Sequence, residues 1–326
     1  MSFWDGRKTL ITGGSGFIGS HLVDHLLDAG ADVRVVGRNR GNLEKKIGDR
    51  ISGVDFYTGD IREPDVAVAC CKDRDSVFHL AAQVAGAGWN SAHPGTMLTQ
   101  NLACGIHMLD GAVKNNVERF LCVSSACVYQ SHCNVPTPED EGFVGEPDQT
   151  NFGYGWSKRT LEAQARGYAQ EFPMKIGIVR PYNGYGPRDD FEPETSHAIP
   201  ALIRKVVEGM DPIEVWGDGS QARSFIYVSD FVKGLMLGLE KYPKCEPVNI
   251  GTDEEVTITR LIEKIIRIAN SNVSIKYDIT RPMGQPRRNG DFQKAHKVLG
   301  FKPDVPLEEG LKRTIDWYLN YRKLAT

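Results

Sequence analysis

The stretch TLITGGSGFIG, at Thr9–Gly19, decides the fold of this chain. A short β-rich run, TLIT, passes directly into three glycines with the spacing Gly13-x-x-Gly16-x-x-Gly19. From FIG onward, apolar residues recur at helical spacing until Gly30, which is typical of a helix C-cap. Glycines suit such a turn because the bend is tight and the helix packs closely on the strand. The stretch therefore predicts a strand, a glycine-rich turn and a helix.

Further β-rich runs alternate with amphipathic stretches through the first half of the chain. Strands are expected at Asp32–Val36, Ser76–Leu80, Arg119–Ser125 and Lys175–Pro181, and again at Pro247–Gly251. This alternation builds a parallel sheet that is covered by helices on both faces. The predicted fold class is α/β, a Rossmann-type doubly wound parallel sheet with a smaller mixed α/β substrate-binding lobe. Because the composition changes after Tyr182, we predict a dinucleotide-binding domain from residues 1–182 plus about 224–251, and a second lobe from residues 183–223 plus 252–326.

Composition excludes several classes of protein. The 326 residues carry a net charge of −3 with both signs interspersed, which argues against a nucleic-acid partner. No apolar run approaches the ~18 residues that a membrane span needs, so we expect no membrane partner and a cytoplasmic location. The seven cysteines are scattered and lack CxxC spacing, so no metal site is expected and a reducing compartment fits.

The glycine-rich turn predicts a phosphate-binding site, because a helix N-terminus offers free N–H groups and a favourable dipole. Roughly 20 residues further on, an acid selects NAD, whereas an arginine accommodates the 2′-phosphate of NADP. VVGRNRGN places Arg38 there, with Arg40 beside it, so NADP is favoured over NAD. The alternative is that both arginines are merely solvated. Asp60, in TGDIRE, is expected either to accept from the adenine amino group or to cap the next turn.

A serine, a tyrosine and a lysine form the candidate catalytic group. Ser125 follows the fourth predicted strand, and Tyr154 and Lys158 are four residues apart, on one face of a helix. In this arrangement an ammonium is expected to lower the pKa of a phenol, which then takes a proton from a sugar hydroxyl. A YxxxK pattern alone usually means an exposed helix face, but its place after a nucleotide-binding turn favours catalysis.

The motifs TGGSGFIG, GDI, HLAA, SSACVY, YGWSK, RPYNGYGP and WGDGSQARSFIYVSD together resemble the extended short-chain dehydrogenase/reductase family of NAD-dependent epimerases and dehydratases. The resemblance covers essentially the whole chain. It implies a nicotinamide cofactor, a nucleoside-diphosphate sugar bound by the second lobe, and a homodimer. It also implies that Ser125, Tyr154 and Lys158 are catalytic. The cofactor contacts that follow are Gly13, Gly16, Phe17, Ile18, Gly19, Arg38, Asp60, Ile61, Ala81, Tyr154 and Lys158.

Two further residues point to proton chemistry. Cys127 lies two residues past Ser125, a β-period step that directs it to the same cleft, and it matches a cysteine of the GDP-mannose 3,5-epimerase and GDP-fucose synthase families. The segment DDFEPETSHAIPALIRK resembles the part of GDP-fucose synthase that supplies a histidine, here His197. The epimerase supplies a lysine there, and none lies between Lys175 and Lys205. The alternatives are a small buried thiol at Cys127 and a helix-capping role for His197.

The same resemblance implies the remaining substrate contacts, since guanidinium groups suit phosphate recognition. They are Gln83, Gly88, Asn183, His197, Arg223, Arg287 and Arg288, with Arg287 and Arg288 left as alternatives for one contact. The resulting prediction is a nucleoside-diphosphate-sugar epimerase, GDP-linked, that acts at C3 and/or C5 through a 4-keto sugar with or without reduction at C4. Two alternatives remain: a simple 4-epimerase or 4-ketoreductase that uses only the Ser/Tyr/Lys trio, and a non-catalytic NAD(P)-binding sensor.

Overall fold

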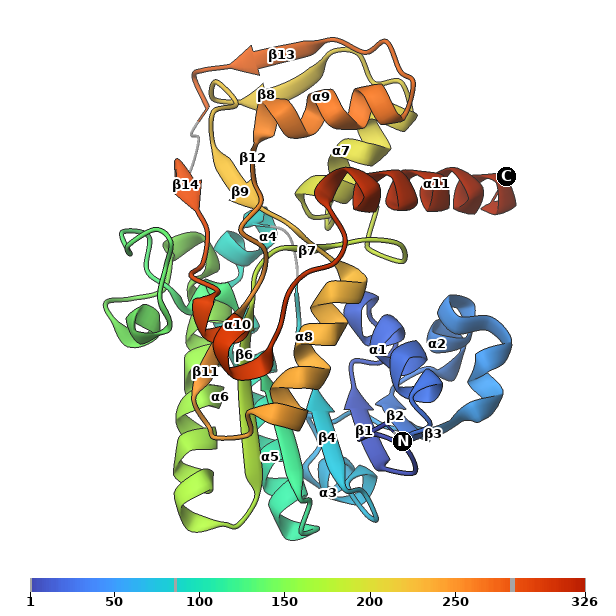
Figure 1. The fold of residues 1–326 in the computed structure, drawn as a ribbon, viewed down its shortest axis with the longest axis vertical. Helices are drawn as coiled ribbons and strands as arrows, with labels where there is room; N and C mark the ends of the chain where they lie inside the picture. Colours follow the sequence, from blue (N-terminus) through green and yellow to red (C-terminus); the bar gives the residue numbers. More distant parts are fainter. Residues whose placement is uncertain (1, 85–86, 282–284, 326) are drawn as a thin grey trace.

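A seven-stranded parallel sheet forms the centre of the structure, a computed structural model that describes residues 2–84, 87–281 and 285–325 (Figure 1). Its strands are β1 (Lys8–Thr12), β2 (Asp32–Gly37), β3 (Val54–Thr58), β4 (Ser76–His79), β5 (Arg119–Val123), β6 (Lys175–Pro181) and β11 (Pro247–Ile250). They lie in the order β11-β6-β5-β4-β1-β2-β3, and every neighbouring pair is parallel. Since the strand order reverses direction at β1, the predicted doubly wound α/β fold is confirmed.

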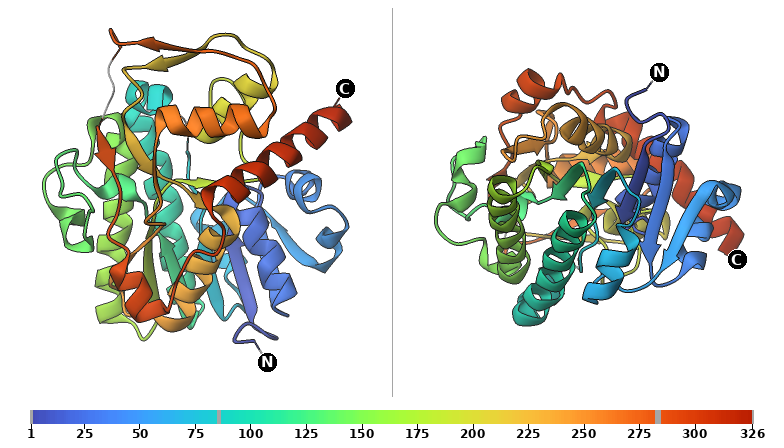
Figure 2. Two further views of the ribbon diagram at one scale, coloured as in Figure 1. Left: turned by 45° about the horizontal axis from the view of Figure 1, so that its top comes forward. Right: turned by 90° about the horizontal axis from the view of Figure 1, so that it is seen from below.

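Helices cover both faces of this sheet (Figures 1 and 2). One face carries α1 (Phe17–Asp28), α2 (Arg40–Ile47), α8 (Val228–Lys241) and α10 (Gln293–Leu299); the other carries α3 (Pro64–Cys70), α5 (Pro94–Lys114) and α6 (Phe152–Glu171). Consecutive strand residues point to opposite faces, so Leu10 is buried in one apolar cluster and Ile11 in the other. The continuous apolar strands of the sequence are therefore explained by burial on both sides.

Three predicted strands end earlier than expected. β11 stops at Ile250, one residue before the predicted Gly251. β5 stops at Val123, and Ser125 instead caps a short 3₁₀ helix. β4 stops at His79, before the predicted Leu80. The short 3₁₀ helices are η1 (Gly48–Gly53), η2 (Ala126–Val128), η3 (Glu139–Phe143) and η4 (Gln149–Asn151).

A smaller lobe lies over the carboxyl ends of the strands (Figure 1). Its strands are β8 (Ile213–Trp216), β9 (Ala222–Ser224), β12 (Glu255–Thr257), β13 (Ile275–Asp278) and β14 (Arg287–Arg288), and its helices are α7 (Ala198–Val207), α9 (Ile258–Ile268) and α11 (Leu307–Ala325). Between the lobes β7 (Gly184–Tyr185) pairs with β10 (Ile226–Tyr227), and α4 (Ala87–Ala92) precedes α5. The lobe buries its own apolar cluster, which includes Ile203, Leu261 and Leu311.

One segment that the sequence prediction gave to the second lobe packs elsewhere. Ala295 and Leu299 of α10, with Phe301, are buried in the same apolar cluster as Val248 and Ile250 of β11. The physical reason is that β11 is the last strand of the sheet, and its apolar face needs a cover. The division into two domains otherwise stays a prediction. Within the described ranges, no helix combines the length and apolar character that crossing a membrane requires.

Candidate active site

Most of the predicted cofactor contacts, together with Ser125, follow the carboxyl ends of strands in the large sheet. Gly13 follows β1, Arg38 follows β2, and Asp60 lies two residues after β3. Ala81 follows β4, and Ser125 follows β5. Because parallel strands end at one edge of a sheet, these residues converge beside the second lobe, where ligands bind in folds of this type.

The glycine-rich turn is shaped by close approach to the neighbouring strand. Gly13 has φ +71°, and a Cβ on it would lie 2.9 Å from the backbone nitrogen of Ala81. The hydroxyl of Thr12 accepts the Ala81 N–H at 3.0 Å and lies 2.9 Å from Nδ1 of His79, which fixes the two strand ends together. Gly16 begins α1 without a side-chain cap, so the first amides of the helix are open to a ligand.

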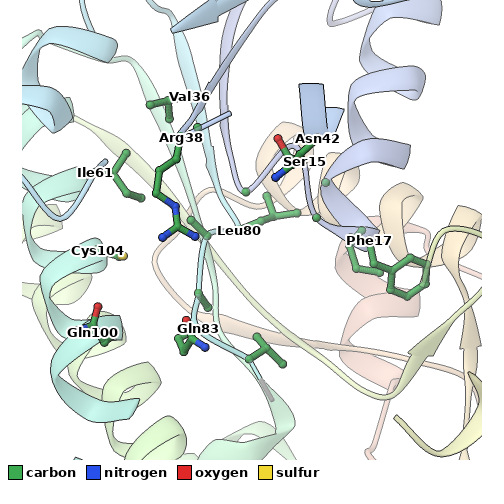
Figure 3. Close-up of a pocket in the computed structure, with 18 of the residues that line it drawn as sticks. Ser15, Phe17, Val36, Arg38, Asn42, Ile61, Leu80, Gln83, Gln100 and Cys104 are labelled. Carbon is green, nitrogen blue, oxygen red and sulfur yellow. The ribbon is translucent and has the colours of Figure 1, made fainter. Parts of the chain in front are cut away.

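A cavity of about 530 Å³ opens in front of this turn (Figure 3). Nine of the predicted cofactor contacts line it: Gly13, Gly16, Phe17, Ile18, Gly19, Arg38, Asp60, Ile61 and Ala81. The other two, Tyr154 and Lys158, lie outside its lining. The structure adds Asn42, Gln100 and Cys104, which the sequence analysis missed. A glycine-lined cradle with open helix amides beside a cavity of this size fits a dinucleotide.

Charged groups at the far end of the cavity differ in how they are paired. The Arg38 side chain is exposed and points into the cavity (Figure 3). Asp60 accepts hydrogen bonds from Nε of Arg62 at 2.9 and 3.1 Å, and this contact lowers the pKa of Asp60 to about 2. Asp60 also accepts the backbone N–H of Arg62 at 3.0 Å, so it caps the turn while lining the cavity. Arg40 lies outside the lining and donates to the Ile51 carbonyl at 3.4 Å.

Tyr154 and Lys158 lie one turn apart near the start of α6, as predicted. Burial raises the pKa of Tyr154 and lowers that of Lys158, while a hydrogen bond with Ser125 acts to lower the pKa of Tyr154. This differs from the expectation that the lysine lowers the pKa of the phenol. The Lys158 ammonium lies 5.4 Å from the centre of the Tyr154 ring and donates to the Val123 carbonyl at 2.9 Å. The tyrosine is therefore held in its neutral form.

A buried ionic network, which the sequence analysis missed, lies between the α6 helix that carries Tyr154 and Lys158 and the central sheet. Glu162, one turn after Lys158, accepts hydrogen bonds from Nε and Nη2 of Arg180 at 2.8 and 2.7 Å, and both side chains are fully buried. The hydroxyl of Ser124 donates to the same carboxylate, and Arg180 donates to the Tyr129 hydroxyl at 3.1 Å. The network joins α6 to β5 and β6, so it fixes the helix that carries Tyr154 and Lys158 against the sheet.

Two arginines of the second lobe lie side by side and face the catalytic loop. Arg288 of β14 pairs in register with Arg223 of β9, so the two side chains share a face. Nη2 of Arg288 lies 3.6 Å from Sγ of Cys127, whose side chain is half-buried. Arg287 points to the opposite face, where it forms a bidentate ion pair with Glu255 at 2.7 and 2.8 Å. Of the two alternatives, only Arg288 therefore faces the catalytic loop.

His197 lies on the cofactor side of the site. It precedes α7, but its side chain makes no capping hydrogen bond, so the helix-capping alternative is wrong. Its Nδ1 lies 4.0 Å from Oδ1 of the buried Asp189, which raises the pKa of His197. Both residues line the cavity with the glycine-rich turn. In the part of the chain that the structure describes, His197 contacts Asp189 and the Cys127 thiol contacts Arg288. The two predicted proton-transfer residues therefore have different charged neighbours.

The remaining predicted substrate contacts are Gln83, Asn183 and Gly88. Gln83 lines the cavity, and its backbone N–H and carbonyl are both bonded to the side chain of Asn101, at 2.7 and 3.1 Å. Asn183 donates to the Ser224 carbonyl at 2.9 Å, next to Arg223. Gly88 belongs to α4, and residues 85 and 86, which precede this helix, lie outside the described residues.

A family model, the NAD dependent epimerase/dehydratase family, matches residues 9–251. The chain belongs to this family. dTDP-4-dehydro-6-deoxy-D-allose reductase of Streptomyces bikiniensis is 33% identical over 98% of both chains. A probable GDP-L-fucose synthase of Oryza sativa subsp. japonica is 32% identical over 96% of this chain and 92% of its own. GDP-mannose 3,5-epimerase 1 of Oryza sativa subsp. indica is 32% identical over 97% of this chain and 83% of its own.

Solved structures support the same assignment. UDP-glucose 4-epimerase of Thermotoga maritima, solved with UDP-glucose, has a TM-score of 0.85 and 29% sequence identity to this chain. The match covers 98% of this chain and 99% of the other. The predicted resemblance to the extended short-chain dehydrogenase/reductase family is thus confirmed. The family is one of NAD(P)-dependent enzymes.

Some residues of the site carried a signal that sequence analysis could have used. Glu162 follows Lys158 by four residues, so it lies on the same helix face and one turn deeper. Asp189 lies in the segment DDFEPETSH, which also supplies His197. By contrast, nothing local to Gln100 or Cys104 marks either residue as part of the site, since both reach the cavity from the side of a long helix.

Proposed function

We propose that this chain is a nucleoside-diphosphate-sugar epimerase, GDP-linked, that inverts C3 and/or C5 through a 4-keto sugar. The observation that carries the proposal is the half-buried Cys127 thiol, two residues after Ser125 and 3.6 Å from the guanidinium of Arg288. A thiol in such a position serves as an acid or base in addition to the trio. The relatives of this chain include both an epimerase and a synthase of GDP-sugars, which supports the nucleotide assignment.

The trio is assigned to chemistry at C4. A bound nicotinamide would exchange a hydride with that carbon. Tyr154, hydrogen-bonded to Ser125 and raised in pKa by burial, then carries the proton of the C4 oxygen. Because its neutral form is favoured, Tyr154 is suited to donate a proton to a 4-keto sugar that is being reduced.

Cys127 and His197 are assigned to the protons at C3 and C5. A ketone at C4 makes these protons acidic, because the carbanion left behind is an enolate with its charge on O4. The guanidinium of Arg288 lies beside the Cys127 thiol, and Asp189 is an anion near His197, which favours an imidazolium acid. Removal of a proton by Cys127 and its return by His197 on the other face would invert the carbon.

The nucleotide contacts are assigned to the second lobe and the cofactor contacts to the sheet edge. Arg223 and Arg288 would hold the diphosphate, with Asn183 beside them, and Arg38 would contact the 2′-phosphate of NADP. Gln83 would contact the sugar from the cavity edge. A homodimer and a cytoplasmic location stay predictions.

The experiment that tests this function follows deuterium uptake in heavy water by NMR. The purified chain is incubated with GDP-mannose, with the 4-keto-6-deoxy derivative of GDP-mannose, and with UDP-glucose, each with and without NADPH. Label at C3 or C5 is expected, and its dependence on NADPH separates epimerisation alone from epimerisation with reduction. Turnover without any label at C3 or C5 would overturn the proposal.

A second candidate is a 4-ketoreductase or 4-epimerase that uses the trio alone. It is favoured by the reductase from Streptomyces bikiniensis among the relatives. Under this candidate, Cys127→Ala and His197→Ala retain full turnover, and no label enters C3 or C5. The first candidate predicts that both variants lose the label.

A further inference from the structure

An acidic residue lies close to the proposed contact for the 2′-phosphate of NADP. β2 and β3 are neighbours in the sheet, with Gly37 opposite Thr58. Arg38 follows Gly37 and Asp60 lies two residues after Thr58, so both side chains line the same cavity. A free carboxylate at this place would repel a phosphate. The way in which Asp60 is paired therefore affects the choice of cofactor.

Arg62 takes up both carboxylate oxygens of Asp60. Its Nε donates to Oδ1 at 2.9 Å and to Oδ2 at 3.1 Å, and its Nη2 also donates to Oδ2. Its backbone N–H donates to Oδ1 at 3.0 Å. From the side of α5, the amide oxygen of Gln100 accepts a hydrogen bond from Nη1 of Arg62. The guanidinium of Arg62 is therefore held in place against the Asp60 carboxylate by two partners.

This pairing leaves Arg38 available for a ligand. The contact with Arg62 is the main reason why the pKa of Asp60 falls to about 2, and Arg38 contributes a smaller effect, so Arg38 is within electrostatic reach of the same carboxylate. Within the described ranges, however, Asp60 forms its ion pair with Arg62, whereas the Arg38 side chain is exposed and points into the cavity (Figure 3). Two cations and one anion leave one positive charge, which Arg38 carries.

We propose that Arg62 is a specificity-determining residue for the cofactor, which acts by masking the charge of Asp60. With Arg62 in place, the carboxylate neither repels a 2′-phosphate nor draws Arg38 into an ion pair. Without Arg62, the carboxylate would do both. NAD lacks this phosphate, so the masking matters to NADP alone. The inference rests on the proposed use of NADP and assigns part of that preference to a residue that need not touch the phosphate.

The test measures the dissociation constants of NADPH and NADH for the full chain by fluorescence titration. The quantity compared is the ratio of the Kd of NADH to the Kd of NADPH. Arg62→Met is expected to lower this ratio about five-fold, because a doubly charged phosphate then meets an unmasked carboxylate in a solvent-exposed cavity. An unchanged ratio in Arg62→Met would overturn the proposal.

A double variant separates masking from direct contact. Asp60→Asn combined with Arg62→Met removes the acid as well as its partner, so the ratio is expected to return to within about two-fold of that of the unchanged protein. Any damage to the binding of the adenine affects both cofactors and cancels in the ratio. If the ratio stays as low as in Arg62→Met alone, Arg62 itself contacts the phosphate, and the masking mechanism is wrong.

The matched control is Arg34→Met. Arg34 of β2 forms an ion pair with Asp55 of β3 at 2.6 Å, in register between the same two strands but outside the lining of the cavity. Its loss should leave the ratio unchanged. A fall equal to that in Arg62→Met would trace the effect to loosened strands and contradict the proposal.

The outcome is separable from that of the proposed function. If Arg38→Met lowers the ratio and Arg62→Met does not, the masking by Arg62 is wrong and the proposed use of NADP stands. If Arg38→Met leaves the ratio unchanged, the proposed phosphate contact fails and the masking fails with it. The epimerase function is decided separately, by deuterium at C3 or C5.

Discussion

The cofactor side and the substrate side of this site are built in different ways. On the cofactor side, the contacts follow the ends of neighbouring strands in one sheet, and the Asp60 carboxylate is already held by Arg62. On the substrate side, Cys127 comes from the first lobe, whereas Arg223 and Arg288 come from strands of the second. There two like charges lie in register, and burial together with Arg288 lowers the pKa of Arg223.

The difference shows what each side needs from its ligand. The cofactor side offers open helix amides and the exposed Arg38, and its Asp60 carboxylate is already paired with Arg62, so a dinucleotide adds contacts there without relieving a repulsion between neighbouring like charges. The substrate side keeps two neighbouring cations, an arrangement that costs stability until an anion arrives. Variants should therefore affect stability and binding differently on the two sides.

The largest effect is expected at Tyr154, where the two sides meet. Tyr154→Phe removes the proton carrier and should lower kcat by about 10³-fold, while leaving the affinities for cofactor and substrate nearly unchanged. Steady-state kinetics and titration with each ligand measure the two quantities. A loss of less than ten-fold would show that another group carries the proton at O4.

Arg223→Met tests the substrate side. Losing a charge-assisted hydrogen bond to phosphate costs about 2–3 kcal/mol, so the Kd of the nucleotide sugar should rise roughly 30- to 150-fold. The melting temperature should not fall, because the repulsion between Arg223 and Arg288 is removed. Calorimetric titration and thermal unfolding check both points, with the exposed Arg260→Met as control. A clear drop in melting temperature would contradict the view that the paired arginines are kept for an anion.

Arg38→Met is the corresponding change on the cofactor side. It should raise the Kd of NADPH by about ten-fold, which is about 1.4 kcal/mol, and leave the Kd of NADH unchanged. Fluorescence titration of both cofactors gives the ratio. Equal weakening of the two would mean that Arg38 does not meet a 2′-phosphate.

The smallest effect is expected at Asp189. Because Asp189 raises the pKa of His197, the imidazolium persists to higher pH with the carboxylate than without it. In Asp189→Asn the alkaline limb of the pH profile for deuterium labelling should move to lower pH, by about one unit or less. The limb should keep its place if Asp189 has no electrostatic effect on His197, and should vanish in His197→Ala.

The sequence predicts the cofactor side of the site better than the substrate side. The glycine-rich turn and the strand ends are local patterns, so the sheet and nine cofactor contacts follow from short motifs. The choice between Arg287 and Arg288 needed strand register, because adjacent residues on a strand face opposite ways. The neutral form of Tyr154 needed the observed burial and the direction of the Lys158 side chain, neither of which the YxxxK pattern contains.

The helix α10 has a consequence for how the molecule is made. Its residues Ala295 and Leu299, with Phe301, cover β11, although most of the sheet is encoded far earlier in the chain. A chain leaving the ribosome therefore displays the strands of the nucleotide-binding half well before their last apolar cover has been synthesised. Since exposed apolar surface and open strand edges promote aggregation during synthesis, the cofactor-binding half matures late and is a natural client for chaperones until then.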